Sequence, residues 1–527
     1  MEFSTNRIPA LKTQTIIGGT VFALGLWVAY EIAGMIASGN MRMVEFAALG
    51  FAGLAAVVTI LRSWRTGFYF FFVWLMFEDL ARKYMNNGLV LFFGKDILAA
   101  LTYVSLYAAI RRGREKTFRP PFLFPLALFV WLGVIQIFNP NSPSPLYGLL
   151  GFKVDFFYIP LIWVGYALIR NDEDLRKFLV ANCTVAAVIG GVGIIQALVG
   201  NSFLNPAVLD RNIAELGNLD KWTPLGGQKF NLPDSIFVST GRFGEYLVVA
   251  FIVVAATLGY LLLSSPKGRK ISFAAIAIVA VAILLSGNRG PLVYVAASAL
   301  VLAVGSLWGM RRGRPESRLL WKALRRSVIV ATLALAGVLV MFPDRAGTRI
   351  AFYTQTLMPT SSAYEGTWRG WGYPLENLKF AFETPHWILG NGIGVASLGR
   401  QYVAEVLHQP PPDVWVEEGF GVLIVELGII APFLWLIWSA ALLYFCWKVV
   451  LTLRGTRFLP LAMAIFWYAL LLLILLTWFG FSTYQNYINN AYLWILVGIL
   501  FRLPDLRNQD TVAVATVLSG AVPAQGA

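Results

Sequence analysis

Residues 270–309 read KISFAAIAIVAVAILLSGNRGPLVYVAASALVLAVGSLWG, and this stretch decides the fold. Two apolar segments, 270–286 and 290–309, flank a short polar turn around Arg289. A membrane-spanning helix needs about 20 mostly apolar residues, so each segment predicts one span. A charge at membrane depth is costly, and where one occurs it faces a wet cavity or a partner. Arg289 is therefore the first candidate for a functional residue.

The composition of the whole chain indicates an integral membrane protein. Of its 527 residues, 58% are hydrophobic and 13% are charged, whereas soluble domains carry about 25% charged residues. Apolar segments of spanning length recur, so we expect an all-α polytopic transmembrane helical bundle of about 12–14 spans. The predicted spans are 15–37, 43–62, 66–80, 94–111, 120–139, 150–169, 177–199, 241–265, 270–286, 290–309, 326–343, 419–447, 458–481 and 486–502.

The positive charges predict which side of the membrane each loop faces. Basic residues concentrate in short loops such as 111–119 and 311–326, and loops of this kind stay in the cytoplasm. Both termini are then cytoplasmic, although Arg82 and Lys83 fall on the opposite side. The expected regions are a cytoplasmic N-terminus (1–14), an N-terminal membrane region (15–240) with an outer loop at 200–240, central spans (241–343), a large and mostly helical outer loop (344–418), C-terminal spans (419–502) and a disordered cytoplasmic tail (503–527).

The residue counts argue against two other classes of protein. The formal net charge of +14 follows from the positive-inside loops, so no nucleic-acid partner is expected. The chain has two histidines and two cysteines, and a zinc site needs several such ligands close together, so no metal site is expected. Cys183 and Cys446 lie inside apolar segments and are interpreted as small core residues.

Arginines on the outer side form a candidate ligand site. Arg289 lies between two spans, Arg369 lies among tryptophans in GTWRGWG (366–372), and Arg242 opens a span in STGRFGEYL (239–247). Guanidinium groups bind phosphate oxygens through two parallel hydrogen bonds. Three arginines from separate segments would therefore suit a diphosphate with an apolar tail.

Other interpretations of the outer arginines stay open. Each candidate arginine could instead bind lipid headgroups or pair with a nearby glutamate, for which the sequence offers Glu245, Glu365 and Glu376. Three further outer arginines are expected to be ordinary surface charges: Arg211, Arg345 and Arg400.

Four stretches, in this order, resemble the O-antigen ligase and O-antigen polymerase superfamily of bacterial polytopic membrane glycosyltransferases. They are GRFGEYLVVAFIV (241–253), LLSGNRGPLVYVAA (284–297), TWRGWGYPLENLKFAFETPHWILGNGIGVAS (367–397) and VLIVELGIIAPFLWLIW (422–438). The chain departs from the family pattern at Asn288, where serine is usual, and at Ala431, where glycine is usual.

The resemblance implies an enzyme of surface-polysaccharide assembly in the bacterial inner membrane. Such an enzyme transfers a glycan from an undecaprenyl diphosphate carrier to another glycan or to a lipid-A-core sugar, on the periplasmic face and without a cofactor or metal. Arg289 and Arg369 map onto family arginines that hold the diphosphate, and Arg242 is the third candidate. The expected partners are the lipid-linked glycan, the acceptor, membrane lipid and a chain-length regulator or export proteins.

Two alignments compete for the general base that activates the acceptor. In the first, His408 with Gln409 occupies the place of the family's histidine pair, but Val422 then fills a position where glycine, threonine or tyrosine is usual. In the second, ELGII (426–430) is aligned and Glu417 with Glu418 replaces the histidine pair. A carboxylate with a raised pKa does the same chemical work. We prefer the second alignment, which favours a polymerase over a ligase and leaves protein glycosylation open.

The alternative class is a transporter of a small anion or of the lipid-linked sugar itself. Charged residues inside predicted spans, such as Lys95, Asp96 and Asp155, are compatible with transport. The lack of a detectable internal repeat argues against it, because many transporters are built from repeats.

Overall fold

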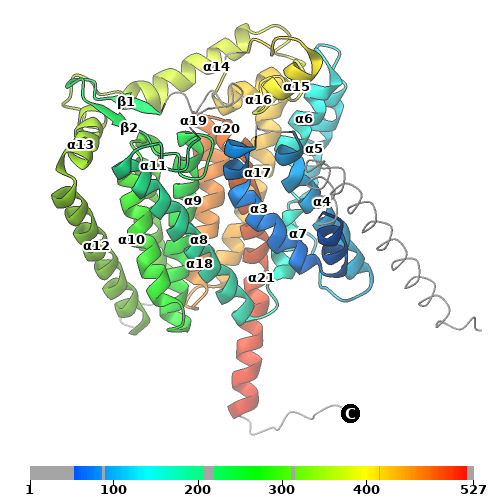
Figure 1. Ribbon diagram of the computed structural model, residues 1–527. Coiled ribbons are helices and arrows are strands. Elements are labelled where there is room, and N and C mark those ends of the chain that lie inside the picture. Colours follow the sequence, from blue (N-terminus) through cyan, green and yellow to red (C-terminus); the bar gives the residue numbers. More distant parts are fainter. Residues whose placement is uncertain (1–52, 86–88, 207–218, 310–314, 415, 519–527) are drawn as a thin grey trace, which may run out of the picture.

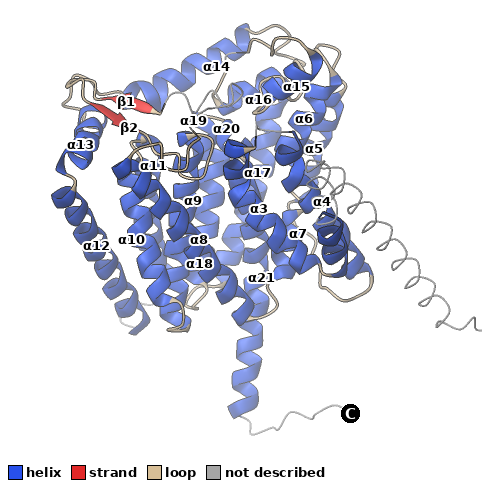
Figure 2. Cartoon of the chain, viewed as in Figure 1, coloured by secondary structure: helices blue, strands red, loops and turns tan. Residues whose placement is uncertain are grey.

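Helices form nearly all of the regular structure in the computed structural model of the chain (Figures 1 and 2). The structure describes residues 53–85, 89–206, 219–309, 315–414 and 416–518. The predicted N-terminal segment (1–14), the predicted span 15–37, most of the span 43–62 and Arg211 lie outside these residues.

The N-terminal helices follow the predicted apolar segments. They are α3 (Trp64–Tyr84), α4 (Leu89–Arg111), α5 (Leu123–Ile137), α6 (Pro145–Phe156), α7 (Leu161–Leu168) and α8 (Asp172–Val199). The segment predicted as one span at 150–169 is broken between α6 and α7, next to Pro160. Proline lacks the amide hydrogen of a regular helix and collides with the preceding turn, which accounts for the break.

The central part contains a short hairpin as well as helices. Its elements are β1 (Asp220–Trp222), β2 (Lys229–Asn231), α9 (Thr240–Ser264), α10 (Arg269–Leu285), α11 (Arg289–Gly309), α12 (Pro315–Met341) and α13 (Pro343–Leu357). The two strands pair antiparallel, with Lys221 opposite Phe230. This hairpin lies within the predicted outer loop 200–240 and is an addition to the all-helical expectation.

The C-terminal part is interrupted by two π-helical turns. Its elements are η2 (Trp368–Gly372), α14 (Tyr373–Glu383), α15 (Arg400–Leu407), α16 (Gly419–Leu427), α17 (Ile430–Thr452), α18 (Leu459–Leu470), η3 (Leu471–Leu476), α19 (Thr477–Phe479), α20 (Ser482–Gln485) and α21 (Tyr487–Leu518). The elements α13, α14, α15 and the β1–β2 hairpin lie at the end of the bundle opposite to the end from which α21 projects (Figure 1). We call this the cap end.

Eight described segments are long and apolar enough to cross a membrane, judged by length and composition. They are Leu91–Arg111, Pro145–Leu168, Asp172–Val199, Thr240–Ser264, Arg289–Gly309, Arg318–Met341, Ile430–Thr452 and Leu459–Phe479. The chain is therefore a predominantly helical, multi-pass membrane protein, and the total of 12–14 spans stays a prediction. The centre of the bundle contains α9 and the α18–α19 segment, in which most side chains are buried.

The tail differs from the expected disorder after Pro504, because α21 continues to Leu518. Leu503 and Leu506 are buried against the core. Arg502 donates from Nε to the Ile169 carbonyl oxygen at 2.9 Å, which fixes the turn just before the proline. Burial on both sides of Pro504 compensates for the hydrogen bond that proline cannot donate.

The position of Arg82 and Lys83 is explained by burial rather than by topology. Arg82 Nη1 lies 2.9 Å from Asp79 Oδ1, and Lys83 Nζ lies 2.8 Å from Asp234 Oδ2. All four side chains are almost completely buried. A buried cation with a partner does not report which side of the membrane its loop faces, so these residues do not contradict the predicted topology.

Candidate functional site

The turn between α10 and α11 fixes Arg289 at the start of α11. Gly287 in this turn has a φ of +71°, a conformation that glycine adopts without steric cost. A Cβ atom at Gly287 would lie 2.7 Å from the ring of Phe230 on β2. Asn288 donates from Nδ2 to the carbonyl oxygen of Thr240 at 3.0 Å. The turn is thereby held between the hairpin and the start of α9.

Arg289 and Arg369, which the sequence predicts to act together, meet at one carboxylate. Arg289 Nη1 lies 3.0 Å from Glu365 Oε2, and Arg369 Nε lies 3.6 Å from the same oxygen. Lys221 is a further cation here, because its Nζ and the Arg289 guanidinium carbon lie 4.7 and 5.4 Å from the ring of Phe352. We call Lys221, Arg289 and Arg369 around Glu365 the Glu365 cluster.

The charge of Lys221 is sensitive to its surroundings. Burial, followed by repulsion from Arg289, lowers the pKa of Lys221 to about 8, and attraction by Glu365 opposes that change. An additional anion beside Lys221 would stabilise its protonated form. The Glu365 cluster therefore has the electrostatics of an anion site whose counter-ion in this structure is a protein carboxylate.

A cavity of about 340 Å³ borders the Glu365 cluster, and we call it the first cavity. Lys221 and Arg289 line it, together with the apolar side chains of Val248, Leu472 and Leu476. Arg369 and Glu365 are not among its lining residues, and Arg369 is linked to it through Glu365, which pairs with the lining residue Arg289. Cations beside an apolar wall suit a ligand with a phosphate head and a hydrocarbon tail.

Arg242 lines a second cavity, of about 510 Å³. Its Nη1 lies 3.0 Å from each carboxylate oxygen of Asp79. Its neighbour Gly241 lines the first cavity instead. Successive residues of a helix point in different directions, so the start of α9 contributes to both cavities. The structure thus brings Arg289 and Arg369 together and places Arg242 at the adjoining cavity.

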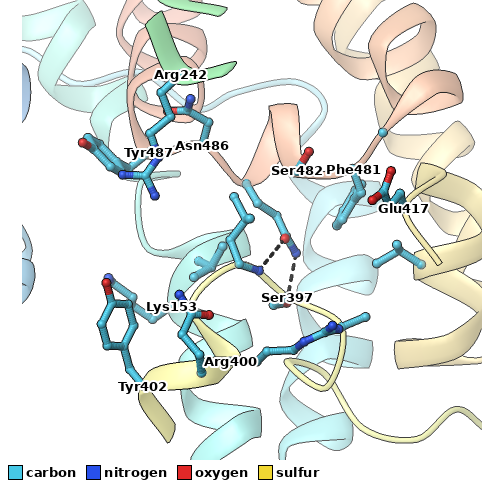
Figure 3. A pocket seen from close by; sticks show the side chains of 18 of the residues that line it. Lys153, Arg242, Ser397, Arg400, Tyr402, Glu417, Phe481, Ser482, Asn486 and Tyr487 are labelled. Atoms are coloured by element: carbon cyan, nitrogen blue, oxygen red, sulfur yellow. Dashed lines mark hydrogen bonds between the residues drawn. The ribbon is translucent and has the colours of Figure 1, made fainter. Parts of the chain in front are cut away.

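The second cavity is lined by four cations from four helices. They are Lys95 of α4, Lys153 of α6, Arg242 of α9 and Arg400 of α15, and Figure 3 labels the last three. Lys95 Nζ lies 2.8 Å from Glu78, and Lys153 Nζ lies 2.8 Å from Asp96. Arg400, expected to be an ordinary surface charge, lines the cavity and donates to the carbonyl oxygen of Val414 at 3.2 Å.

A glycine-rich turn, which the sequence singled out, supports one wall of the second cavity. Gly394 has a φ of +98°, and a Cβ there would collide with the Tyr147 carbonyl oxygen of α6. Glu426 of α16 accepts hydrogen bonds from Ala396 N at 2.8 Å and Ser397 Oγ at 3.0 Å. The turn is therefore clamped between α6 and α16, and the residues that follow it face the cavity.

Amide groups complete that wall. Gln485 donates from Nε2 to Ser397 Oγ at 2.9 Å, and its Oε1 accepts from the backbone amide of Leu398 at 3.0 Å (Figure 3). Gln485 Nε2 also donates to Asp155 at 3.0 Å. These contacts fix the orientation of the Gln485 amide, so it presents a defined polar surface to any ligand.

The two cavities share a wall at the break between α19 and α20. Phe479, Gly480 and Ser482 line both cavities. The amide of Phe481 donates to the carbonyl oxygen of Glu417 at 3.1 Å, which attaches Glu417 to this shared segment. Groups bound in the two cavities would therefore border the same short segment.

Of the predicted bases Glu417, Glu418 and His408, Glu417 lines one of the two cavities and the other two do not. Its side chain is exposed and lines the second cavity. Its Oε2 accepts a hydrogen bond of 2.6 Å from the hydroxyl of Tyr373. Burial, followed by this hydrogen bond, raises the pKa of Tyr373 to about 12, so the tyrosine stays protonated and remains a donor at neutral pH.

Glu418 and His408 occupy different places. Glu418 is fully buried and accepts from the amides of Phe420 at 2.9 Å and Gly421 at 2.6 Å, which makes it the N-cap of α16. Burial raises its pKa to about 7. His408 is exposed in a left-handed conformation, with a φ of 52°, at the end of α15. The linings of the two cavities include neither residue.

Metal ligands do not gather in the part of the chain that the structure describes: no group of three or more His, Cys, Asp or Glu side chains there could hold a metal ion. No family model matches the chain, and neither a curated protein nor a solved structure matches it.

Two of the residues that sequence reasoning missed had visible signals. Lys153 stands out as a charge inside the predicted span 150–169, and so does Lys95 in the span 94–111, where it is interpreted only as a charge compatible with transport. Lys221 had no such signal, because it lies in a polar loop whose hairpin geometry only the fold reveals.

Proposed function

We propose that the protein is a polyprenyl-diphosphate-dependent glycosyltransferase. In this proposal it transfers a glycan from an undecaprenyl diphosphate carrier to a glycan or lipid acceptor, on the periplasmic face of the bacterial inner membrane. The first cavity holds the carrier, with the diphosphate at Arg289 and Arg369 and the polyprenyl chain along Val248 and Leu472. The second cavity holds the acceptor beside Glu417.

The observation that carries the proposal is the shared wall of the two cavities. One cavity has cations beside apolar side chains, and the other contains a carboxylate hydrogen-bonded to Tyr373. Phe479, Gly480 and Ser482 border both, so a donor and an acceptor would meet at this segment. Holding two reactants next to each other is itself a large part of catalysis.

The proposed reaction needs no group beyond those already described. The acceptor hydroxyl oxygen attacks the anomeric carbon of the donor sugar, and the bond from that carbon to the diphosphate oxygen breaks. Glu417 takes the proton of the hydroxyl, as a general base does. Undecaprenyl diphosphate leaves with the electron pair, and Arg289, Arg369 and Lys221 stabilise its negative charge in the manner of a phosphoryl clamp.

The identity of the general base favours one class of acceptor over another. Glu417 at the second cavity fits the alignment in which a glutamate pair replaces the family's histidine pair, and that alignment favours a polysaccharide polymerase over a ligase. A role in O-antigen or exopolysaccharide assembly belongs to the same proposal, with a chain-length regulator or export proteins as partners.

Transport is the competing proposal, and the buried ion pairs of Lys95 and Lys153 favour it. A transporter needs a route to both faces. A cavity of about 190 Å³ lined by Arg114, Glu115 and Arg170 shares no lining residue with the two cavities described above. The separate linings favour an enzyme that works at one face.

The test is glycan transfer by the purified protein from a synthetic undecaprenyl-diphosphate oligosaccharide to an oligosaccharide acceptor. Arg289→Lys and Arg369→Lys should each lower the initial rate by about 100-fold, the loss typical of removing one well-placed donor to a transition-state oxyanion. Arg345→Ala, an exposed arginine on α13, is the matched control and should retain full rate. Full transfer by both lysine variants would overturn the proposal.

A further inference from the structure

We propose that the second cavity recognises a negatively charged saccharide, so that the acceptor is an acidic glycan with a carboxylate close to the sugar that is extended. Only the identification of the bound saccharide as the acceptor rests on the proposed function. The anion site itself is argued from the cavity. The inference assigns Lys95, Lys153 and Arg400 to ligand binding.

The balance of charge on the lining is the first observation. Four cations and one carboxylate, that of Glu417, face the cavity. The carboxylates that pair with Lys95, Lys153 and Arg242 belong to Glu78, Asp96 and Asp79, and these are not lining residues. Glu78 and Asp79 have no exposed surface and Asp96 has little. The lining therefore presents mainly positive charge, while the compensating negative charge lies behind it.

The spacing of the two lysines is the second observation. Lys95 Nζ lies 4.4 Å and Lys153 Nζ 4.2 Å from the centre of one aromatic ring, that of Phe92. Two ammonium groups on the same ring repel each other across a partly desolvated space. A carboxylate beside either lysine would relieve that repulsion and accept a charge-assisted hydrogen bond.

Arg400 has the geometry of a recognition group. It donates from Nη1 to the Val414 carbonyl oxygen at 3.2 Å, and the ion pairs found among the described residues do not include it. A guanidinium has five N–H donors in a planar fork, so one backbone contact leaves donors for a ligand. Arg400 follows the clamped glycine-rich turn, which holds its backbone in place.

The rest of the lining suits a sugar rather than a bare anion. Ser397, Gln485 and Asn486 offer hydroxyl and amide groups, and Tyr402 and Tyr487 offer aromatic faces with polar edges. The volume of about 510 Å³ falls in the range of about 300–1,000 Å³ typical of small-molecule sites. The cavity thus offers neutral hydrogen-bonding groups as well as cations.

The experiment is a binding titration of the purified full-length chain in nanodiscs of zwitterionic lipid. The probe is a linear trimer of galacturonic acid, and the comparison is the same trimer with its carboxylates reduced to alcohols. We expect the acidic trimer to bind at least about tenfold more tightly, which corresponds to one charge-assisted contact. Raising the salt concentration should weaken the acidic trimer more than the neutral one.

Two variants test which residues act. Arg400→Gln should reduce the preference for the acidic trimer by about tenfold. Lys153→Gln is made together with Asp96→Asn, so that no buried carboxylate is left without a cation. Lys379→Gln is the control, because Lys379 is a lysine of α14 with a side chain 77% exposed. Equal affinity for both trimers, unchanged preference in the variants, or no binding of the acidic trimer would each overturn the inference.

Competition identifies the source of the negative charge. The competitors of the bound acidic trimer are inorganic diphosphate, added phosphatidylglycerol and an excess of the same trimer. If diphosphate or phosphatidylglycerol displaces the bound trimer at a lower concentration than the excess trimer does, the cavity is a phosphate site and the inference fails. Arg289→Lys should leave trimer binding unchanged and should weaken binding of undecaprenyl diphosphate. Unchanged carrier binding in Arg289→Lys, together with intact trimer binding, would count against the transferase alone, so the two proposals fail separately.

Discussion

Arg289 and Arg369 lie 80 positions apart in the sequence and contact the same oxygen atom, Oε2 of Glu365, at 3.0 and 3.6 Å. Glu365 therefore occupies the place between two guanidinium groups where a phosphate oxygen of the carrier is proposed to bind. A ligand that enters this place must displace the carboxylate. The structure thus contains a competitor for its own proposed ligand.

Replacement of Glu365 should strengthen carrier binding. Glu365→Gln removes the negative charge but retains a side chain of the same size, so the arginines lose their internal counter-ion. We expect the Kd for undecaprenyl diphosphate to fall by about tenfold, or about 1.4 kcal/mol. The measurement is a titration in nanodiscs, with Glu376→Gln as control because Glu376 is an exposed carboxylate of α14. A higher Kd for Glu365→Gln, that is, weaker binding, would show that Glu365 orients the arginines rather than competing with the ligand.

Loss of the Glu417 carboxylate should stop the chemical step without preventing substrate binding. Glu417→Gln cannot accept the acceptor proton, and we expect kcat to fall by about 100-fold or more. Tyr373→Phe removes only the 2.6 Å hydrogen bond to Glu417 and should have a smaller effect. Exposed Glu405 on α15 is the matched control, as Glu405→Gln. If His408→Ala lowers kcat while Glu417→Gln does not, the histidine is the base.

Glu418 should affect stability rather than transfer. Glu418→Ala removes the two hydrogen bonds that cap α16, and loss of an N-cap costs about 1 kcal/mol. Thermal unfolding should show a lower Tm, while kcat per folded molecule stays within about twofold of the wild type because Glu418 lies outside the cavity linings. A kcat loss as large as that of Glu417→Gln at unchanged Tm would contradict the capping role.

The pKa of Glu418 predicts the direction of a pH effect. Its pKa in the folded protein, about 7, lies above the ordinary value of 4.5, so the folded state binds the proton more tightly. The contribution of Glu418 to stability is therefore present at acid pH and is lost as the pH rises through about 7. Glu418→Gln keeps a capping oxygen without this titration. Its stability should change less between pH 5 and pH 8 than that of the wild type, as measured by denaturant unfolding.

Binding of inorganic diphosphate to the Glu365 cluster should weaken above neutral pH. Lys221 has a pKa of about 8, so it loses its positive charge as the pH rises through that value. A bound anion favours the protonated lysine, and the Kd should therefore rise between pH 7 and pH 9. Lys221→Arg stays charged and should have a flatter profile, measured by titration at each pH. An identical pH dependence in Lys221→Arg would exclude Lys221 as the titrating group.

The apolar segments predict the helices well and their interruptions poorly. The predicted spans 241–265 and 290–309 correspond to Thr240–Ser264 and Arg289–Gly309. Hydropathy reports neither the break beside Pro160, which proline itself causes, nor the π-helical turn Leu471–Leu476, which lies within a continuous apolar segment. The prediction of a disordered tail is wrong at its start, because Leu503 and Leu506 are fixed by burial rather than by local sequence.

The sequence likewise predicts some residues of the candidate site and misses others. The sequence identifies Arg289 by its place between two apolar segments and Arg369 by its place among tryptophans in an outer loop, and the structure brings them together. The sequence predicts Arg400 to be a surface charge, and this is wrong because the glycine-rich turn that directs it towards the cavity is fixed by tertiary contacts with α6 and α16. The pairing of Lys153 with Asp96 likewise joins residues of two different helices, which no local pattern predicts.

The most direct measurement is a cryo-EM structure of the protein in nanodiscs with undecaprenyl diphosphate. We expect density for the diphosphate within hydrogen-bonding distance of Arg289 and Arg369, with the Glu365 carboxylate displaced and the polyprenyl chain along Val248 and Leu472. Density for the diphosphate in the second cavity, at Lys153 and Arg400, with Glu365 still between the two arginines, would contradict it.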